Sequence, residues 1–249
     1  MPEVIAHRGH SKVYPENTIL AFQKAISAGA DGFETDVHFT EDRQLIVHHR
    51  YELGATDNGV GFVQDWTKPY LQALDCGGWK GKQFEGETMP ALEDVLELFG
   101  SQTKIEIELK AFGGVFAEAV LNEVIDRDLL SSVRLTSYQY PLLAYLKNIN
   151  REVKVGLIAQ RCEEWMDRSV YQGLIESSLT EGIIDAIHVP IKFLDKPFVS
   201  RLKSYDVGVQ AGQVDTVEEL EKAVDLNVDN ICTNDLELAL KVVKGSRNL

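Results

Sequence analysis

The chain has 249 residues, 44% of them hydrophobic, and a formal net charge of −14 at pH 7. This length suits one large domain or two small ones, and α/β barrels are commonly of this size. The charge argues against nucleic acid and anionic membrane surfaces as partners, because both attract Lys- and Arg-rich patches. An anionic substrate would need a local cation in order to bind.

No apolar run reaches the roughly 20 residues that a membrane helix needs, so no stable membrane association is expected. The first expected strand begins within the first few residues, which leaves no room for a secretory signal. Cys76, Cys162 and Cys232 match neither a zinc spacing nor a disulfide framework. Together these features predict a cytoplasmic protein with reduced thiols.

Apolar, β-branched runs alternate with amphipathic stretches along most of the chain. In chain order, the expected strands are residues 4–6, 32–38, 44–48, 104–109, 133–137, 153–158, 186–189, 207–210 and 230–232. The expected helices are residues 17–28, 91–99, 115–127, 141–148, 163–177, 197–204, 216–226 and 236–244. Asn17 is expected to cap the first helix, and Asp215 with Glu218 the seventh.

Residues 44–48 are interpreted as an extension of the second strand, which leaves eight strand–helix units. Strict alternation predicts a parallel sheet, and eight units predict an α/β fold of the TIM (β/α)8 barrel type. An open, doubly wound sheet is the alternative, but no Gly-rich dinucleotide loop follows the first strand.

Residues 50–88 interrupt this alternation with seven glycines and the interleaved aromatics Trp66, Tyr70 and Trp79. The segment is long for a connection, and long ordered loops are usually functional or form small subdomains. We expect one domain over residues 1–249, with an insertion at 50–88 over one barrel mouth. A lid and a mere surface elaboration are equally compatible with its sequence.

The triplet His7-Arg8-Gly9 falls where the first strand ends and the first helix begins. Arg8 offers a planar fork that suits phosphate oxygens. His7 can move a proton near neutral pH. Gly9 allows the backbone to bend or a ligand to come close. The triplet predicts a corner that binds phosphate.

Acidic residues alternate along the next two barrel strands. Glu34 and Asp36 share one face of the second strand, and Glu106, Glu108 and Lys110 repeat the pattern on the third. The carboxyl ends of barrel strands converge, so these carboxylates should lie close together. Burying several ionised carboxylates without a positive partner costs too much desolvation free energy. A hard divalent cation held by Glu34, Asp36 and Glu108 is the favoured interpretation. A cluster of salt bridges with the neighbouring cations is the alternative.

His49 follows the extension of the second strand and is expected at the same mouth as His7. Two imidazoles on opposite sides of a phosphate can act as general base and general acid. The other histidines are interpreted as structural groups: His10, His38, His188 and His48, the last packed outside the barrel.

An ordered series of motifs resembles the glycerophosphodiester phosphodiesterase family over nearly the whole barrel. The series comprises His7-Arg8-Gly9, Pro15-Glu16-Asn17-Thr18, Gly32-Phe33-Glu34-Thr35-Asp36, His49 and Ile107-Glu108-Leu109-Lys110. The resemblance implies a TIM barrel with a small insertion after the second strand. It also implies hydrolysis of glycerophosphodiesters to glycerol 3-phosphate and an alcohol.

The same resemblance implies a role for each matching residue. Mg²⁺ or Ca²⁺ would be held by Glu34, Asp36 and Glu108. His7 and His49 would form the acid–base pair, with Arg8 and Lys110 on the phosphate and Glu16 supporting the site. The attacking oxygen, which is either a glycerol hydroxyl that gives a cyclic phosphate or water, is left open.

Two positions depart from the family pattern. Arg50 stands where the family has Asp, and we slightly favour a rebuilt insertion over an extra clamp on the substrate. Gly212 stands where the family has Trp, which leaves room for a bulkier or more polar substrate. Gln210 and Gln213 are expected to hydrogen-bond that substrate. Asn234 also replaces a residue that is often acidic, with no account from the sequence.

Two other functions compete with this one. A phospholipase D-like enzyme that forms a cyclic phosphate would use similar residues, but those enzymes are secreted and carry disulfides. A catalytically inactive barrel that binds phosphodiesters is disfavoured, because the full set of expected site residues is present. The expected partner is a small-molecule glycerophosphodiester, and a homo-oligomer is left open.

Overall fold

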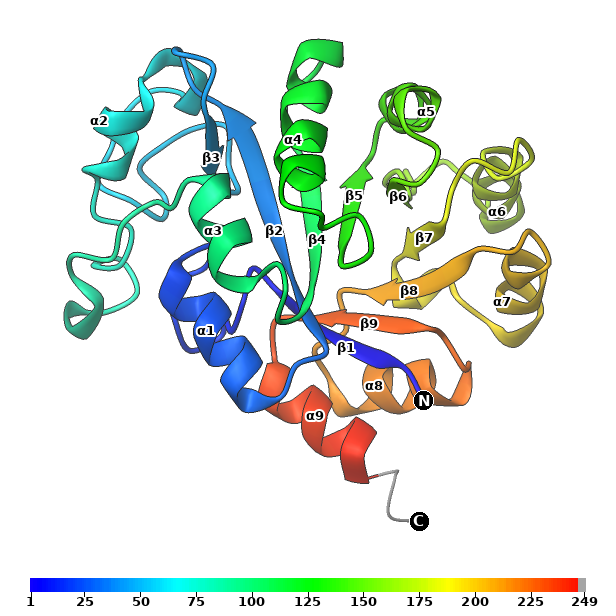
Figure 1. Ribbon diagram of the computed structural model, residues 1–249. Coiled ribbons are helices and arrows are strands. Elements are labelled where there is room, and N and C mark those ends of the chain that lie inside the picture. Colours follow the sequence, from blue (N-terminus) through cyan, green and yellow to red (C-terminus); the bar gives the residue numbers. More distant parts are fainter. Residues whose placement is uncertain (246–249) are drawn as a thin grey trace.

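Short runs of buried apolar residues form eight parallel strands, and the first of them pairs with both the second and the last, so that the sheet closes on itself (Figure 1). These strands are β1 (Glu3–His7), β2 (Gly32–Phe39), β4 (Lys104–Leu109), β5 (Val133–Ser137), β6 (Lys154–Ile158), β7 (Ala186–Val189), β8 (Gly208–Gly212) and β9 (Asn230–Thr233). The computed structural model describes residues 1–245, and within them the predicted TIM barrel is confirmed.

Residues 44–48 do not extend the second strand, and this expectation was wrong. A polar turn reverses the chain, and Leu45–Val47 form a separate strand, β3, which pairs antiparallel with β2. The period-2 pattern is the same in both arrangements, so the sequence did not separate them. The return brings the His48 amide within 3.1 Å of the Asp36 carbonyl oxygen and so carries His49 back to the barrel mouth.

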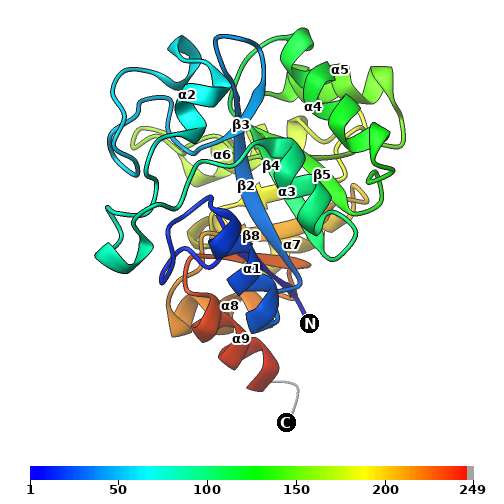
Figure 2. The same ribbon diagram turned by 60° about the vertical axis from the view of Figure 1, so that its left-hand side comes forward.

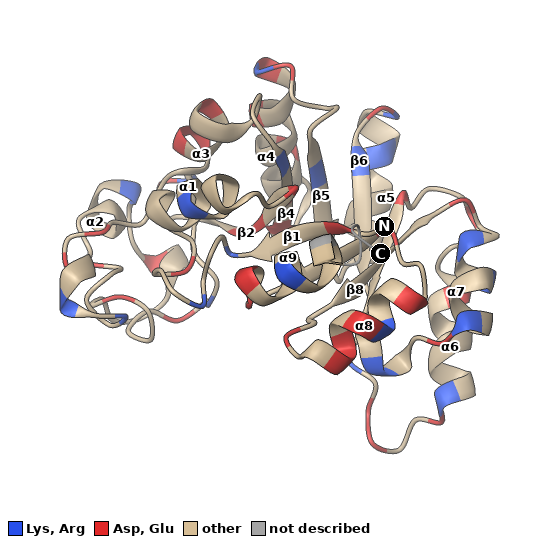
Figure 3. Cartoon of the chain, turned by 90° about the horizontal axis from the view of Figure 1, so that it is seen from below, with Lys and Arg blue, Asp and Glu red and all other residues tan. Residues whose placement is uncertain are grey.

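Amphipathic helices cover the outside of the barrel, and each follows a strand in the chain. They are α1 (Ile19–Ala28), α3 (Leu92–Phe99), α4 (Gly114–Asp126), α5 (Tyr140–Ile149), α6 (Arg168–Ser177), α7 (Lys196–Lys203), α8 (Val217–Asp225) and α9 (Leu236–Gly245). Figure 3 marks acidic residues along α8 and basic residues along α7, and Lys196 pairs with Asp225 between them at 2.9 Å.

Both predicted helix caps are displaced by one residue. Thr18 caps α1, since its Oγ1 accepts a hydrogen bond from the Ala21 amide at 3.2 Å. Thr216 caps α8 in the same way. The side chains of Asn17 and Asp215, which were expected to cap, instead bind residues of β2 and of the segment after β9. Both side chains therefore hold residues at the barrel mouth instead of capping a helix.

An aromatic cluster fixes α1 against β2. Phe22 of α1 stacks on Phe33 of β2 with ring centroids 4.3 Å apart, and Phe99 of α3 packs edge-on against both. All three side chains are buried, and such pairs add specific geometry to hydrophobic burial. Because α1 follows the turn at His7, this cluster sets the position of that turn relative to Glu34.

The insertion after β3 lies at one edge of the barrel, beside α1 and α3 (Figures 1 and 2). It contains the short helix α2 (Lys68–Gln72) and the 3₁₀ turns Val63–Asp65 and Lys82–Phe84. A small apolar core of its own includes Leu53, Leu71 and Met89. Its far end touches the loop before α1, where Lys80 Nζ donates to the Ser11 carbonyl oxygen at 2.6 Å.

Asp57 anchors the start of the insertion. Its carboxylate accepts hydrogen bonds from the amides of Gly54 and Gly59 at 2.9 and 2.8 Å and lies 3.1 Å from His48 Nε2. His48 is therefore buried beneath the insertion, outside the barrel, as expected. Among residues 1–245, no helix combines the length and the apolar character needed to cross a membrane.

Candidate active site

The turn after β1 depends on two left-handed residues. Arg8 has a φ of +57° and Gly9 a φ of +77°. A Cβ atom on Gly9 would lie 2.6 Å from the carbonyl carbon of Ala21, so only glycine fits there. The turn points the Arg8 amide at Glu34 Oε2, 3.1 Å away, and holds the guanidinium over β2.

Three carboxylates meet at the carboxyl ends of β2 and β4. Glu34, Asp36 and Glu108 each offer an oxygen, and these atoms lie within 4.8 Å of one another. The parallel register that places Asp36 beside Glu108 produces this convergence. Asp36 is fully buried, and Asn17 Nδ2 donates to its Oδ2 at 2.8 Å.

Two cations hold this cluster. Arg8 lies 3.3 Å from Asp36 through Nε and 3.1 Å from Glu16 through a terminal nitrogen. Lys110 Nζ lies 3.0 Å from Asp36 Oδ1 and 2.7 Å from Glu108 Oε1. Each cation thus bridges two carboxylates, and Arg8 adds Glu16 to the three described above.

The negative charges in this cluster outnumber the positive ones. When all four carboxylates are ionised, they face two cations, which leaves an excess of two negative charges. Burial and repulsion by Asp36 raise the pKa of Glu34 well above its usual value, and the same two causes raise the pKa of Glu108. Burial also opposes ionisation of Asp36, yet Lys110 and Arg8 outweigh it and hold its pKa well below the usual range. A divalent cation would balance the excess, and carboxylate oxygens are ligands that Mg²⁺ and Ca²⁺ prefer.

His7 lies on one side of the carboxylates. Its Nδ1 is 2.7 Å from Asn234 Oδ1, an acceptor, so Nδ1 carries the proton and Nε2 is the basic nitrogen. Nε2 lies 3.8 Å from Glu34 Oε2 and 2.9 Å from Gln213 Nε2. Burial and the nearby Arg8 charge lower the pKa of His7 to about 4, so the ring is neutral near pH 7.

His49 lies on the other side, where β3 ends. Its Nδ1 is 3.8 Å from Glu16 Oε1, so Glu16 touches both this ring and Arg8. Burial lowers the pKa of His49 to about 3, and the charges of Arg8 and Lys110 act in the same direction. The two imidazoles therefore flank the acidic cluster.

A cavity of about 360 Å³ opens beside His7 at this mouth. Its lining includes Glu34, Glu108, Gly212 and Gln213. A Cβ on Gly212 would meet only the Cys232 Cβ, at 3.6 Å, so this wall has room to spare.

Gln210 also lines that cavity; its amide nitrogen is engaged, while its Oε1 has no hydrogen-bond partner among the residues described. Its Nε2 donates to Glu106 Oε2 at 2.8 Å and lies 3.3 Å from His188 Nδ1, which places it on the cavity floor. Glu106 in turn pairs with Arg134 at 2.7 Å and does not join the three carboxylates above. The structure therefore separates Glu106 from the other acidic residues that the sequence pattern grouped with it.

Asn234 is the residue whose role the sequence did not reveal. Its Oδ1 accepts a hydrogen bond from His7 Nδ1, while its backbone amide and its side-chain Nδ2 each donate to the Asp215 carboxylate at 2.7 Å. The chain Asp215–Asn234–His7 therefore orients the imidazole and selects its tautomer. Because 227 residues separate Asn234 from His7, no local pattern signals this contact.

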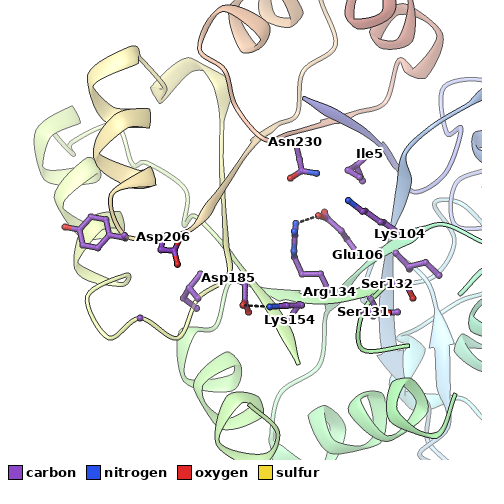
Figure 4. Close-up of a pocket in the computed structure, with 15 residues that line it drawn as sticks. Ile5, Lys104, Glu106, Ser131, Ser132, Arg134, Lys154, Asp185, Asp206 and Asn230 are labelled. Carbon is purple, nitrogen blue, oxygen red and sulfur yellow. Dashed lines mark hydrogen bonds and ion pairs between the residues drawn. The ribbon is translucent and has the colours of Figure 1, made fainter. Parts of the chain in front are cut away.

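A larger cavity, of about 700 Å³, lies at the opposite end of the barrel, where the strands begin (Figure 4). Its cations are paired: Arg134 with Glu106 at 2.7 Å, and Lys154 with Asp185 at 3.4 Å, both drawn as dashed lines in Figure 4. No imidazole lies among its lining residues, and no acidic cluster suited to a metal was found there within residues 1–245.

Comparisons with known proteins agree with this geometry. The sequence matches the Glycerophosphoryl diester phosphodiesterase family over residues 7–238. A glycerophosphodiester phosphodiesterase from Caldanaerobacter subterraneus subsp. tengcongensis is 34% identical over 248 residues, 97% of each chain. The Bacillus subtilis protein YhdW, to which its name gives the same activity provisionally, is 49% identical over 240 residues, 96% of each chain.

Among solved structures, an Oleispira antarctica phosphodiesterase in complex with the product sn-glycerol-3-phosphate has the same fold. Its TM-score is 0.83, at 24% sequence identity, over 98% of this chain and 97% of that one. At this level of identity, the likeness supports the barrel architecture.

Proposed function

The chain belongs to the glycerophosphoryl diester phosphodiesterase family, as its motifs indicated, and we propose that it hydrolyses glycerophosphodiesters to glycerol 3-phosphate and an alcohol by metal-dependent, two-histidine catalysis. One observation carries the proposal. His7 and His49 flank a carboxylate cluster that holds an excess of negative charge, at the carboxyl ends of the barrel strands. That end of a TIM barrel bears the active site in such enzymes.

We assign the metal ion to Glu34, Asp36 and Glu108. The fit rests on the donor set, on the two uncompensated negative charges and on the raised pKa of Glu34 and Glu108. When bound, Mg²⁺ or Ca²⁺ would supply a Lewis acid that polarises a phosphoryl oxygen.

The remaining steps belong to side chains. Arg8 and Lys110 bind and orient the phosphate, and they offset charge that develops on it. His7 accepts a proton from the attacking oxygen, since its Nε2 is unprotonated and Asn234 fixes its tautomer. His49 donates a proton to the leaving alcohol, and the anionic phosphate beside it favours its protonated form. Glu16 positions Arg8 and His49.

The attacking oxygen is either water or the neighbouring glycerol hydroxyl, and the second route gives a cyclic phosphate that water then opens. Both routes need the same base and the same acid. In addition, we propose that residues 1–249 act as one domain in which the insertion at 50–88 borders the mouth. Cytoplasmic location stays a prediction.

The test is turnover of glycerophosphocholine by the purified protein, followed by phosphorus NMR. The expected result is glycerol 3-phosphate, with loss of activity in EDTA and recovery on addition of Mg²⁺ or Ca²⁺. Accumulation of a stable cyclic phosphate would support the phospholipase D-like alternative. No turnover of any glycerophosphodiester with either ion would support an inactive binding barrel.

A further inference from the structure

A second opening at the barrel mouth lies on the insertion side of His49. It is a groove of about 400 Å³. Its lining residues are His49, Arg50, Tyr51, Glu52, Leu53, Ala55, Phe62 and Lys110. We propose that this groove binds the alcohol portion of the substrate and that Arg50 selects alcohols bearing a carboxylate or a phosphate. The inference rests on the proposed function and names its substrate class.

The position of the groove follows from the two histidines. The general acid must lie within hydrogen-bonding reach of the leaving oxygen, so the alcohol departs on the side of His49. The cavity beside His7 does not include His49 in its lining, whereas the groove begins at His49 and Lys110. The glycerol and the alcohol therefore extend in opposite directions from the phosphate.

The backbone that carries Arg50 is held in place from the barrel side. His48 Nδ1 donates to the Arg50 carbonyl oxygen at 2.7 Å, while Arg50 itself is exposed and lines the groove. Tyr51 Oη donates to the Lys110 carbonyl oxygen at 2.7 Å. Arg50 follows His49 directly, so their Cα atoms are about 3.8 Å apart. A group attached to the leaving oxygen is thus close to Arg50.

The insertion supplies the side of the groove that faces residues 51–53. The Val63 amide donates to the Tyr51 carbonyl oxygen, and the Leu53 amide to the Gly61 carbonyl oxygen, both at 2.9 Å. These bonds place Phe62 across from residues 51–53. Tyr51 and Phe62 are about half exposed, at 51% and 49%, and so provide apolar surfaces for the carbon skeleton of an alcohol.

Charge distinguishes Arg50 from the other cation in the groove. Lys110 is engaged by Asp36 and Glu108, whereas no carboxylate within residues 1–245 lies within ion-pair distance of the Arg50 guanidinium. A free guanidinium suits bidentate binding of a carboxylate or a phosphate. In a chain with a net charge of −14, such a group needs a dedicated cation.

Glu52 is the one carboxylate among the groove's lining residues, and the test is designed around it. Glycerophosphoserine and glycerophosphoethanolamine both carry an ammonium that Glu52 would meet equally, and they differ by one carboxylate. The ratio of their kcat/KM values therefore isolates recognition of the anion. Glycerophosphoinositol 4-phosphate against glycerophosphoinositol gives the corresponding ratio for a phosphate.

The variants are Arg50→Gln, Arg50→Lys and the control Arg151→Gln. Arg151 is an exposed arginine before β6, at the other end of the barrel, and its replacement changes the net charge equally. We expect wild type to favour the anionic alcohol in at least one pair. Arg50→Gln should lower that ratio about tenfold, mainly through KM, because an exposed charged hydrogen bond is lost. Arg50→Lys should retain part of the preference, and Arg151→Gln should retain all of it.

The Arg50 assignment is overturned if Arg50→Gln leaves both ratios at the wild-type value, or if Arg151→Gln lowers them as much. A purely structural role for Arg50 would instead lower the thermal midpoint while leaving the ratios unchanged, and this also contradicts the proposal. Failure of the proposed function is distinguishable, because wild type would then hydrolyse none of the four substrates.

Discussion

The cavities at the two ends of the barrel differ in how their acidic and basic side chains are balanced. Where the strands begin, each cation lies against a carboxylate, as in the pairs Arg134–Glu106 and Lys154–Asp185 (Figure 4). Where the strands end, four carboxylates share two cations and two neutral imidazoles lie beside them. The larger cavity is the balanced one. Unbalanced charge, rather than cavity size, is therefore the basis on which we assign the reaction to this end.

The largest loss of activity is expected from a substitution of His49 at the end with unbalanced charge. If His49 is the general acid, His49→Ala should lower kcat by ~10²-fold or more, since the leaving alkoxide then lacks a proton donor. The thermal midpoint should change little, because the ring is partly exposed. The check is kcat for glycerophosphocholine beside a melting curve. Activity near the wild-type level would contradict the assignment of His49.

A smaller effect is expected at the residue that orients His7. Asn234→Ala removes the acceptor of the Nδ1 proton, so the imidazole populates a second tautomer and other orientations. We expect kcat to fall about tenfold with little change in KM, as for an interaction that matters mainly in the transition state. Steady-state kinetics test this. A rise in KM alone would instead place Asn234 in substrate binding.

The excess of charge should also be visible as lost stability in the metal-free protein. Glu34 is buried close to Asp36, and burial with that repulsion raises its pKa. At pH 7, above its unfolded pKa, an ionised Glu34 therefore destabilises the fold. Glu34→Gln should remove that penalty and raise the free energy of unfolding in EDTA by about 1 kcal/mol, because catalytic sites trade stability for function. Chemical denaturation in EDTA measures it, and lower stability would contradict the imbalance.

The smallest effect is expected at the balanced end. Lys154 and Asp185 form an exposed pair at 3.4 Å, and such pairs contribute about 1 kcal/mol or less. Lys154→Gln should therefore leave kcat/KM at the wild-type value and shift the free energy of unfolding by less than that amount. A loss of activity in this variant would show that the two ends are coupled.

Local patterns in the sequence predicted most of the barrel and the acidic cluster. Alternation along a strand placed Glu34, Asp36 and Glu108 correctly on one face, because side-chain direction in a strand has a period of two. The same period does not distinguish a continuing strand from a hairpin, which is why β3 was misassigned. The caps were displaced because Asn17 and Asp215 have tertiary partners that capping rules ignore.

The rest of the site depends on contacts between distant residues. Asn234 meets His7 across the closure of the barrel between β1 and β9, and the sequence offers no spacing that indicates it. The groove at Arg50 is likewise created by the hairpin that returns His49 to the mouth and by the insertion that faces it. Arg50 was noted as a departure from the family, and its position explains how such a departure can affect substrate choice.

The most direct test of this account is calorimetric titration of Mg²⁺ and Ca²⁺ into the chelator-treated protein. The expected result is one ion bound per chain by wild type, no binding by Asp36→Asn, and wild-type binding by Asp185→Asn. The last variant makes the same charge change at the balanced end. Equal binding by both variants, or no binding by wild type, would contradict a metal site at the unbalanced end.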